Sequence, residues 1–82
     1  MNDQDLLARI TTNPSILSGK PVISGTRLSV EFVVNLLVHG AAISDVVREY
    51  DGLQDDDIHA CLLFAANSVS KASFMPLTAE SA

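Results

Sequence analysis

The sequence contains no tryptophan, one cysteine and only five basic residues, and each scarcity excludes a class of protein. The single cysteine, Cys61, excludes an internal disulfide and suits a reducing compartment. No apolar run approaches the ~20 residues of a membrane-spanning helix, and the acidic start Met1–Asp5 lacks a signal-peptide pattern. The formal net charge of −5 argues against bulk attraction to nucleic acid. We therefore expect a cytoplasmic protein.

A hydrophobic share of 48% in 82 residues is enough for one small core. A chain of this size is marginally stable alone, and oligomerisation is a common remedy. The charges are distributed unevenly, since residues 1–30 contain three basic and two acidic residues, whereas residues 31–82 contain two basic and eight acidic ones. An anion-binding surface would therefore belong to the first third of the chain.

The segment Gly19–Val30 organises the chain, because it combines turn residues, cations and the start of a helix. Pro21 restricts the backbone and Gly25 permits a tight or left-handed turn. The short apolar pieces on either side of that turn predict a small β-hairpin or looped strand. Ser29 predicts an N-cap for a helix that begins at Val30.

Apolar residues recur at helical spacing in three segments, which predict helices over residues 30–39, 43–50 and 55–69. The alternation in residues 6–12 predicts a short strand, and residues 14–17 predict one helical turn. The inner face of the third helix is expected to carry a stripe of mostly apolar side chains. These are Ile58, Cys61, Leu62, Ala65, Ala66 and Val69.

Together these patterns predict a mainly α fold, in which a three-helix, helix-turn-helix core follows a short N-terminal β-strand or hairpin element. Residues 1–69 are expected to form the domain, and residues 70–82 a flexible C-terminal tail. The first helix is apolar nearly all round, which is typical of a helix buried on more than one side. We therefore predict a homodimer through this helix. Its candidate interface residues are Phe32, Val33, Leu36 and Leu37.

The string GKPVI-x-GTR at residues 19–27, the apolar helix ending in Gly40, Tyr50 and the segment Leu53–Ile58 resemble the DUF433 family of small bacterial and archaeal proteins. The resemblance covers roughly residues 6–69. It implies a homeodomain-like or winged-helix-like helix-turn-helix fold. It also suggests a VapB-like antitoxin of a toxin–antitoxin system, of the kind often encoded beside a PIN-like ribonuclease toxin.

Nucleic-acid contact, if present, is expected at the turn segment rather than at the third helix. A turn with free amides, a hydroxyl and cations can hold a phosphate, which makes Arg9, Lys20, Thr26 and Arg27 the candidates. The alternative is that Arg27 pairs with a carboxylate such as Glu31 and that Lys20 is solvated. The third helix begins with three aspartates and is a poor recognition helix for DNA.

No catalytic, metal or cofactor site is expected. Neighbouring aspartates on a helix point in different directions, so Asp55–Asp57 with His59 do not predict a metal cluster. Cys61 is expected to be a buried apolar residue rather than a nucleophile, and His39 a helix-end residue.

Three functions remain open for a chain that we expect not to be an enzyme. The first is an antitoxin-like protein that binds a PIN-like toxin, with weak operator DNA binding as a dimer. In that case Phe74, Met75 and Leu77 of the tail are partner-binding candidates, the alternative being a plain disordered end. The second is a stand-alone helix-turn-helix transcription regulator. The third is a structural or oligomerisation module without nucleic-acid binding.

Overall fold

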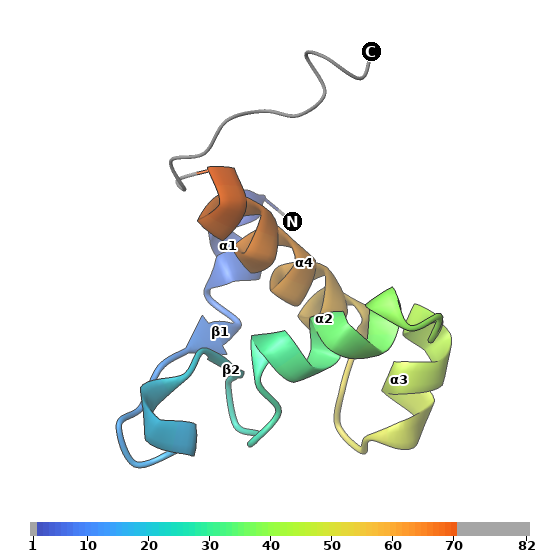
Figure 1. Ribbon diagram of the computed structural model, residues 1–82, viewed down its shortest axis with the longest axis horizontal. Helices are drawn as coiled ribbons and strands as arrows, with labels where there is room; N and C mark the ends of the chain where they lie inside the picture. Colours follow the sequence, from blue (N-terminus) through green and yellow to red (C-terminus); the bar gives the residue numbers. More distant parts are fainter. Residues whose placement is uncertain (1, 71–82) are drawn as a thin grey trace.

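The computed structural model describes residues 2–70, which form four α-helices and a small two-stranded sheet. In Figure 1 the sheet lies at one side of the helices. In chain order the elements are α1 (Asp3–Leu7), β1 (Ile10–Thr11), the 3-10 turn η1 (Leu17–Gly19), β2 (Val22–Ile23), α2 (Val30–Val38), α3 (Ile43–Glu49) and α4 (Asp55–Ser70). The predicted mainly helical fold with a short N-terminal β element is confirmed. The longest helix, α4, is central, because α1, α2, α3 and β1 all pack against it.

The predicted strand over residues 6–12 is wrong, since most of that segment belongs to α1 or to the turn after it, and β1 has two residues. The segment becomes helical because a helix cap precedes it. Asn2 caps α1, because its Oδ1 accepts a hydrogen bond from the backbone N–H of Asp5 at 2.8 Å. Leu6 and Leu7 are half-buried, so the pair that suggested alternation lies on a helix packed against α4.

The sheet joins two distant parts of the N-terminal third. β1 and β2 are antiparallel, with Ile10 opposite Ile23 and Thr11 opposite Val22. The predicted turn at Gly25 is present, and its φ of +80° is the left-handed conformation that glycine permits. After this turn the chain returns to form one bridge between Val22 and Ser29. The predicted hairpin is therefore reduced to a bridge, and the strand partner of β2 is β1.

The helices of the body begin and end close to their predicted positions. The Ser29 hydroxyl accepts a hydrogen bond from the Phe32 N–H at 3.0 Å, which confirms the predicted N-cap of α2. In α3 the first residue outside the helix is Ala42, which has no polar side chain. Instead the Asp45 carboxylate accepts a hydrogen bond from the Ala42 N–H at 3.2 Å.

The core lies where α2, α3 and the first half of α4 meet. Its buried members come from β2, all three of these helices and the turn before α4: Ile23, Val30, Val33, Val46, Leu53, Ile58 and Cys61. The predicted inner face of α4 is thus confirmed at Ile58 and Cys61. It is wrong for its second half, where Leu62, Ala66 and Val69 are exposed.

Candidate functional site

The turn between β2 and α2, together with η1, forms a shallow hollow of about 550 Å³. Its lining combines apolar, hydroxyl and cationic side chains: Leu17, Ser18, Lys20, Arg27, Leu28, Ser29 and Phe32. The structure therefore brings two of the predicted phosphate-binding residues, Lys20 and Arg27, to one depression beside the start of α2.

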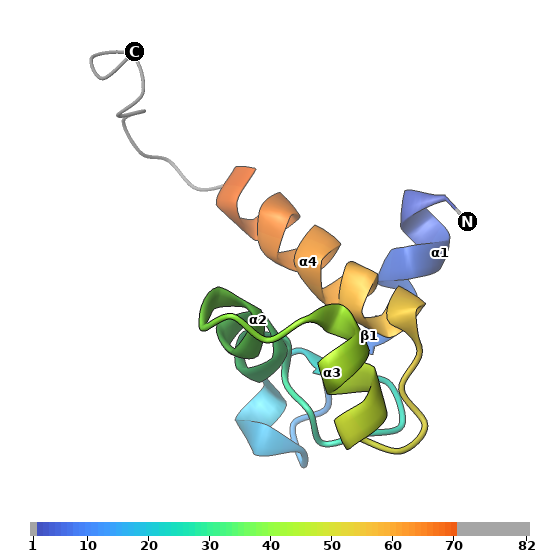
Figure 2. The same ribbon diagram turned by 90° about the vertical axis from the view of Figure 1, so that its right-hand side faces the viewer.

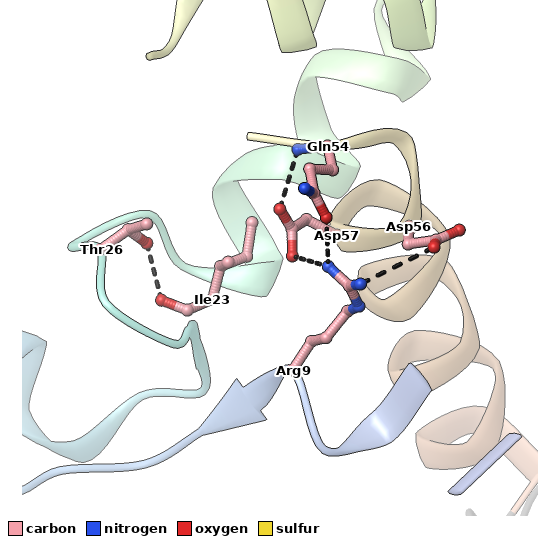
Figure 3. A network of polar contacts seen from close by, with 6 residues as sticks. All are labelled: Arg9, Ile23, Thr26, Gln54, Asp56 and Asp57. Carbon is pink, nitrogen blue, oxygen red and sulfur yellow. Dashed lines mark hydrogen bonds and ion pairs between the residues drawn. The ribbon is translucent and has the colours of Figure 1, made fainter. Parts of the chain in front are cut away.

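The polar side chains of this segment differ in whether they already form hydrogen bonds or ion pairs within the chain. The Thr26 hydroxyl donates to the Ile23 carbonyl at 2.7 Å and accepts from the Leu28 N–H at 3.0 Å, so it holds the turn together (Figure 3). Lys20 Nζ lies 3.1 Å from a carboxylate oxygen of Glu31, and both side chains are exposed. Glu31, the carboxylate that the alternative assigned to Arg27, is thus paired with Lys20. Within residues 2–70, no carboxylate lies within 4.0 Å of the exposed Arg27.

Arg9, the fourth predicted phosphate-binding residue, is committed to the start of α4 (Figure 3). One guanidinium nitrogen donates to Asp57 Oδ1 at 2.9 Å and to Gln54 Oε1 at 3.1 Å. The other lies 3.7 Å from the Asp56 carboxylate. The second oxygen of Asp57 accepts from the Gln54 N–H at 2.9 Å, so one buried carboxylate both caps α4 and binds Arg9. We therefore leave Arg9 out of the candidate anion site.

The pairing pattern leaves an acidic surplus at the junction of α3 and α4. Among residues 2–70, Arg9, Lys20 and Arg48 are paired with carboxylates. Glu49, Asp51 and Asp55 are exposed, and no basic side chain of the described residues lies within 4.0 Å of them. We call these three residues the acidic edge. In a helix-turn-helix, this junction and the start of the second helix would approach DNA phosphates, so the acidic edge opposes that contact.

The predicted dimer-interface residues of α2 differ in their exposure to solvent. Val33 is completely buried in the core of its own chain, so its assignment to a dimer interface is wrong. Leu36 and Leu37 are half-buried and pack against that core. Phe32 is 42% exposed, and its ring meets the Tyr50 ring edge-on at a centroid distance of 6.1 Å. The predicted tail contacts at Phe74, Met75 and Leu77 lie outside the described residues.

Two titratable side chains, Cys61 of α4 and His39 at the end of α2, make local contacts within the fold. Cys61 is buried, and desolvation, followed by the nearby charge of Asp57, raises the pKa of its thiol to about 11. The His39 ring donates from Nδ1 to the Asn35 carbonyl at 2.8 Å at the end of α2. Within the described part of the chain, no three His, Cys, Asp or Glu side chains are grouped to hold a metal ion. Of the helices formed by residues 2–70, none has the length and apolarity to cross a bilayer.

Two features of this region were missed by sequence reasoning. Leu17 and Ser18 line the hollow with φ values of +50° and +58°, the left-handed region that such residues rarely adopt. The neighbouring Gly19 was the only local signal, and it does not indicate that two non-glycine residues share its conformation. The partner of Arg9 was also missed, because Asp57 is 48 residues away in sequence.

Comparison with known proteins gives one consistent result. The sequence profile of the family described as "Protein of unknown function (DUF433)" matches residues 10–65. A crystal structure at 2.00 Å resolution of a DUF433 member protein from Anabaena variabilis ATCC 29413 superposes with a TM-score of 0.73 at 25% sequence identity. The similarity covers 83% of this chain and 67% of that chain. No curated protein matches. Because the profile spans more than half of the 82 residues, the chain belongs to the DUF433 family.

Proposed function

We propose that this protein is a non-enzymatic, antitoxin-like binding protein whose partner is a PIN-like ribonuclease, and that it acts in the cytoplasm. The single observation that carries the proposal is the acidic edge formed by Glu49, Asp51 and Asp55. A protein that handles RNA presents basic surface, and an exposed acidic edge is complementary to it. The resemblance to VapB-like antitoxins suggests the class of partner, and the arrangement of charge suggests the surface that would bind it.

Complementary charge acts on association in a way that can be measured. Exposed carboxylates without basic neighbours steer a basic partner toward the correct face, and this effect weakens as salt rises. The carboxylates that are paired, at Asp45, Asp56 and Asp57, contribute less to this field. Reversing the charge of the acidic edge should therefore change the association rate more than reversing charge elsewhere on the surface.

Co-expression with the product of the adjacent gene, which we expect to be a PIN-like ribonuclease, tests the proposal. We expect the two proteins to co-purify, and the complex to lose ribonuclease activity relative to the free partner. The double variant Glu49→Lys/Asp51→Lys should weaken the complex at least tenfold, with most of the loss in the association rate at low salt. Failure of the wild-type protein to bind this partner would overturn the proposal.

A matched control separates local from global charge. Asp3→Lys/Asp5→Lys changes the net charge by the same amount but lies on α1, away from the α3–α4 junction. We expect this control to bind within about twofold of wild type, because steering depends on where the charge lies. Equal losses in the two double variants would show that only net charge matters.

A second candidate, operator DNA binding, is favoured by one observation. Arg27 is exposed beside the hollow and has no carboxylate within 4.0 Å among residues 2–70. A phosphate there would meet an available guanidinium. The test is a salt-dependent gel shift on the DNA upstream of the gene, with Arg27→Ala and, as control, Arg48→Ala, whose side chain already pairs with Asp45 at 2.6 Å. Absence of a gel shift with the wild-type protein would exclude this candidate, and a shift that Arg27→Ala retains would exclude Arg27 as the phosphate contact.

A further inference from the structure

We propose that the second half of α4 is a self-association surface, through which two copies of this chain pair by their α4 helices. The surface is the stripe formed by His59, Leu62, Ala66 and Val69, all of them exposed. Sequence periodicity assigned three of these residues, Leu62, Ala66 and Val69, to the inside of the fold. The other residues of the described range 2–70 leave them exposed.

The spacing of the stripe is that of a coiled-coil seam. Its four residues follow one another at intervals of three, four and three, which correspond to alternating a and d positions of a heptad. This spacing keeps all four side chains on one face of the helix over about three turns. The face opposite this seam is used within the chain, since Phe64 and Asn67 border a hollow with Leu7 of α1.

Burial changes abruptly along α4. In the first half, Asp57, Ile58, Ala60 and Cys61 are buried. From Leu62 to Ser70 no residue is buried, although six of these nine are apolar. Figure 2 shows why: this part of the helix extends beyond α2 and α3. Helix α1 packs against α4 as well, but it leaves the stripe exposed. Leu62 is 38% exposed and Val69 56% exposed.

The distribution of charge favours a second copy of this chain as the molecule that covers the stripe. The chain carries a net charge of −5, so two copies repel one another wherever their charged surfaces meet. Residues 58–70 contain no Asp, Glu, Lys or Arg, so the part of α4 that carries the stripe lacks these charged side chains in a strongly acidic protein. A basic partner would find no carboxylate here, whereas an identical α4 meets neither repulsion nor an unpaired charge.

The residues flanking the seam also favour close approach of two helices. Next to it, at the e and g positions, lie Leu63, Ala65 and Ser70, which are uncharged, and two of them are small. A two-fold arrangement would place Ala66 of one copy beside the same region of the other. The described seam covers only about three helical turns, so it would bury less surface area than a standard protein–protein interface. We therefore expect a dimer that dissociates on dilution.

Sedimentation equilibrium of the full chain over a concentration series tests the proposal. We expect the wild type to approach twice the 8.7 kDa of one chain as concentration rises. Leu62→Glu and Val69→Glu should each shift the dissociation constant upward by at least tenfold. Val38→Glu is the matched control, because Val38 is 72% exposed and apolar but lies on α2. A wild type that stays monomeric, or a control that dissociates the dimer as strongly as Leu62→Glu, overturns the proposal.

A cross-link provides a second measurement that does not depend on a disruptive substitution. The native Cys61 thiol is buried, with a pKa of about 11, so it does not compete at neutral pH. Ala66→Cys should form an intermolecular disulfide much faster than Val38→Cys under mild oxidation. Equal rates would assign the contact elsewhere. A monomeric wild type that is destabilised by Leu62→Glu would mean that the chain itself covers the stripe.

Discussion

The two halves of α4 differ in where their charged and apolar side chains lie. In the first half, the carboxylate of Asp57 is buried, caps the helix and binds Arg9, while Ile58 and Cys61 are fully enclosed. In the second half, no charged side chain is present, and Leu62 and Val69 remain exposed. The first half is therefore packed within the fold, whereas the second half has apolar surface that the other residues of the range 2–70 do not cover.

This contrast shows that helical periodicity reports which face of a helix is apolar, and not which molecule covers it. The stripe through Leu62 and Val69 is as regular as the stripe through Ile58 and Cys61. The halves differ because α2 and α3 reach only the first part of the helix (Figure 2). Four predictions test this contrast, and they are given in order of decreasing expected effect.

The largest effect is expected from removing apolar contacts in the first half. Ile58 is completely buried in the core, so Ile58→Ala should lower the free energy of unfolding by about 3–4 kcal/mol through lost burial and the cavity left behind. The control Val69→Ala, at a position 56% exposed, should change it by less than about 0.5 kcal/mol in dilute protein. Urea titration followed by circular dichroism measures both. Similar losses at the two positions would contradict the contrast.

The next effect concerns the buried charge of the first half. Asp57→Ala removes the cap on Gln54 and leaves Arg9 without its shortest partner, and we expect a loss of about 3 kcal/mol. Asp56→Ala is the matched control, because this carboxylate is 45% exposed and lies 3.7 Å from Arg9. Its loss should stay below about 1 kcal/mol. Thermal unfolding of both variants separates the buried pair from the peripheral one.

A smaller effect is expected from the thiol at the boundary between the halves. Burial raises the pKa of Cys61 to about 11 from an unperturbed 9.0, so the unfolded chain releases this proton at lower pH than the folded chain. The native state then binds more protons, and its stability should fall as pH rises from about 9 to about 11. Urea titrations across this range, with Cys61→Ala as the reference, measure the difference. A variant with the same pH dependence as wild type would refute it.

The smallest effect belongs to an exposed carboxylate outside α4. A hydrogen bond from the Ala42 N–H, followed by one from Arg48, lowers the pKa of Asp45 below its usual 3.8. The charged form stabilises the start of α3 above that usual value, and the contribution is lost as pH falls through the lower pKa of the folded state. An NMR titration of the side-chain carboxyl should place the pKa of Asp45 below 3.8. The same titration in Arg48→Ala should show a partial return toward the usual value.

Much of the body was predictable because its signals are local. The cap at Ser29, the turn at Gly25 and the starts of α2, α3 and α4 depend on residues within one turn of each position. The strand predicted over residues 6–12 failed because Asn2, just before it, caps a helix that absorbs Leu6 and Leu7. A local signal outside the segment under inspection therefore overrode an apparent alternation within it.

The candidate sites were less predictable, because each depends on distant partners. Sequence placed Arg9, Lys20 and Arg27 in one cationic group, but their carboxylate neighbours decide which of them is available. Lys20 meets Glu31, Arg9 meets Asp57, and Arg27 meets no carboxylate among residues 2–70. The dimer prediction at Val33 failed for a related reason, since a helix that is apolar nearly all round does not show which of its sides the core of its own chain uses.

The sequence by itself determined where helices begin, where the backbone turns, and that residues 58–70 form an apolar helix without charge, because these properties depend on neighbouring residues. Three properties follow from the folded chain and not from neighbouring residues: Asp57 is buried against Arg9, Arg27 has no carboxylate partner among residues 2–70, and half of the apolar stripe of α4 is left exposed by those residues. Burial and ion pairing arise between residues far apart in the chain, and their outcome depends on which elements reach one another in the fold.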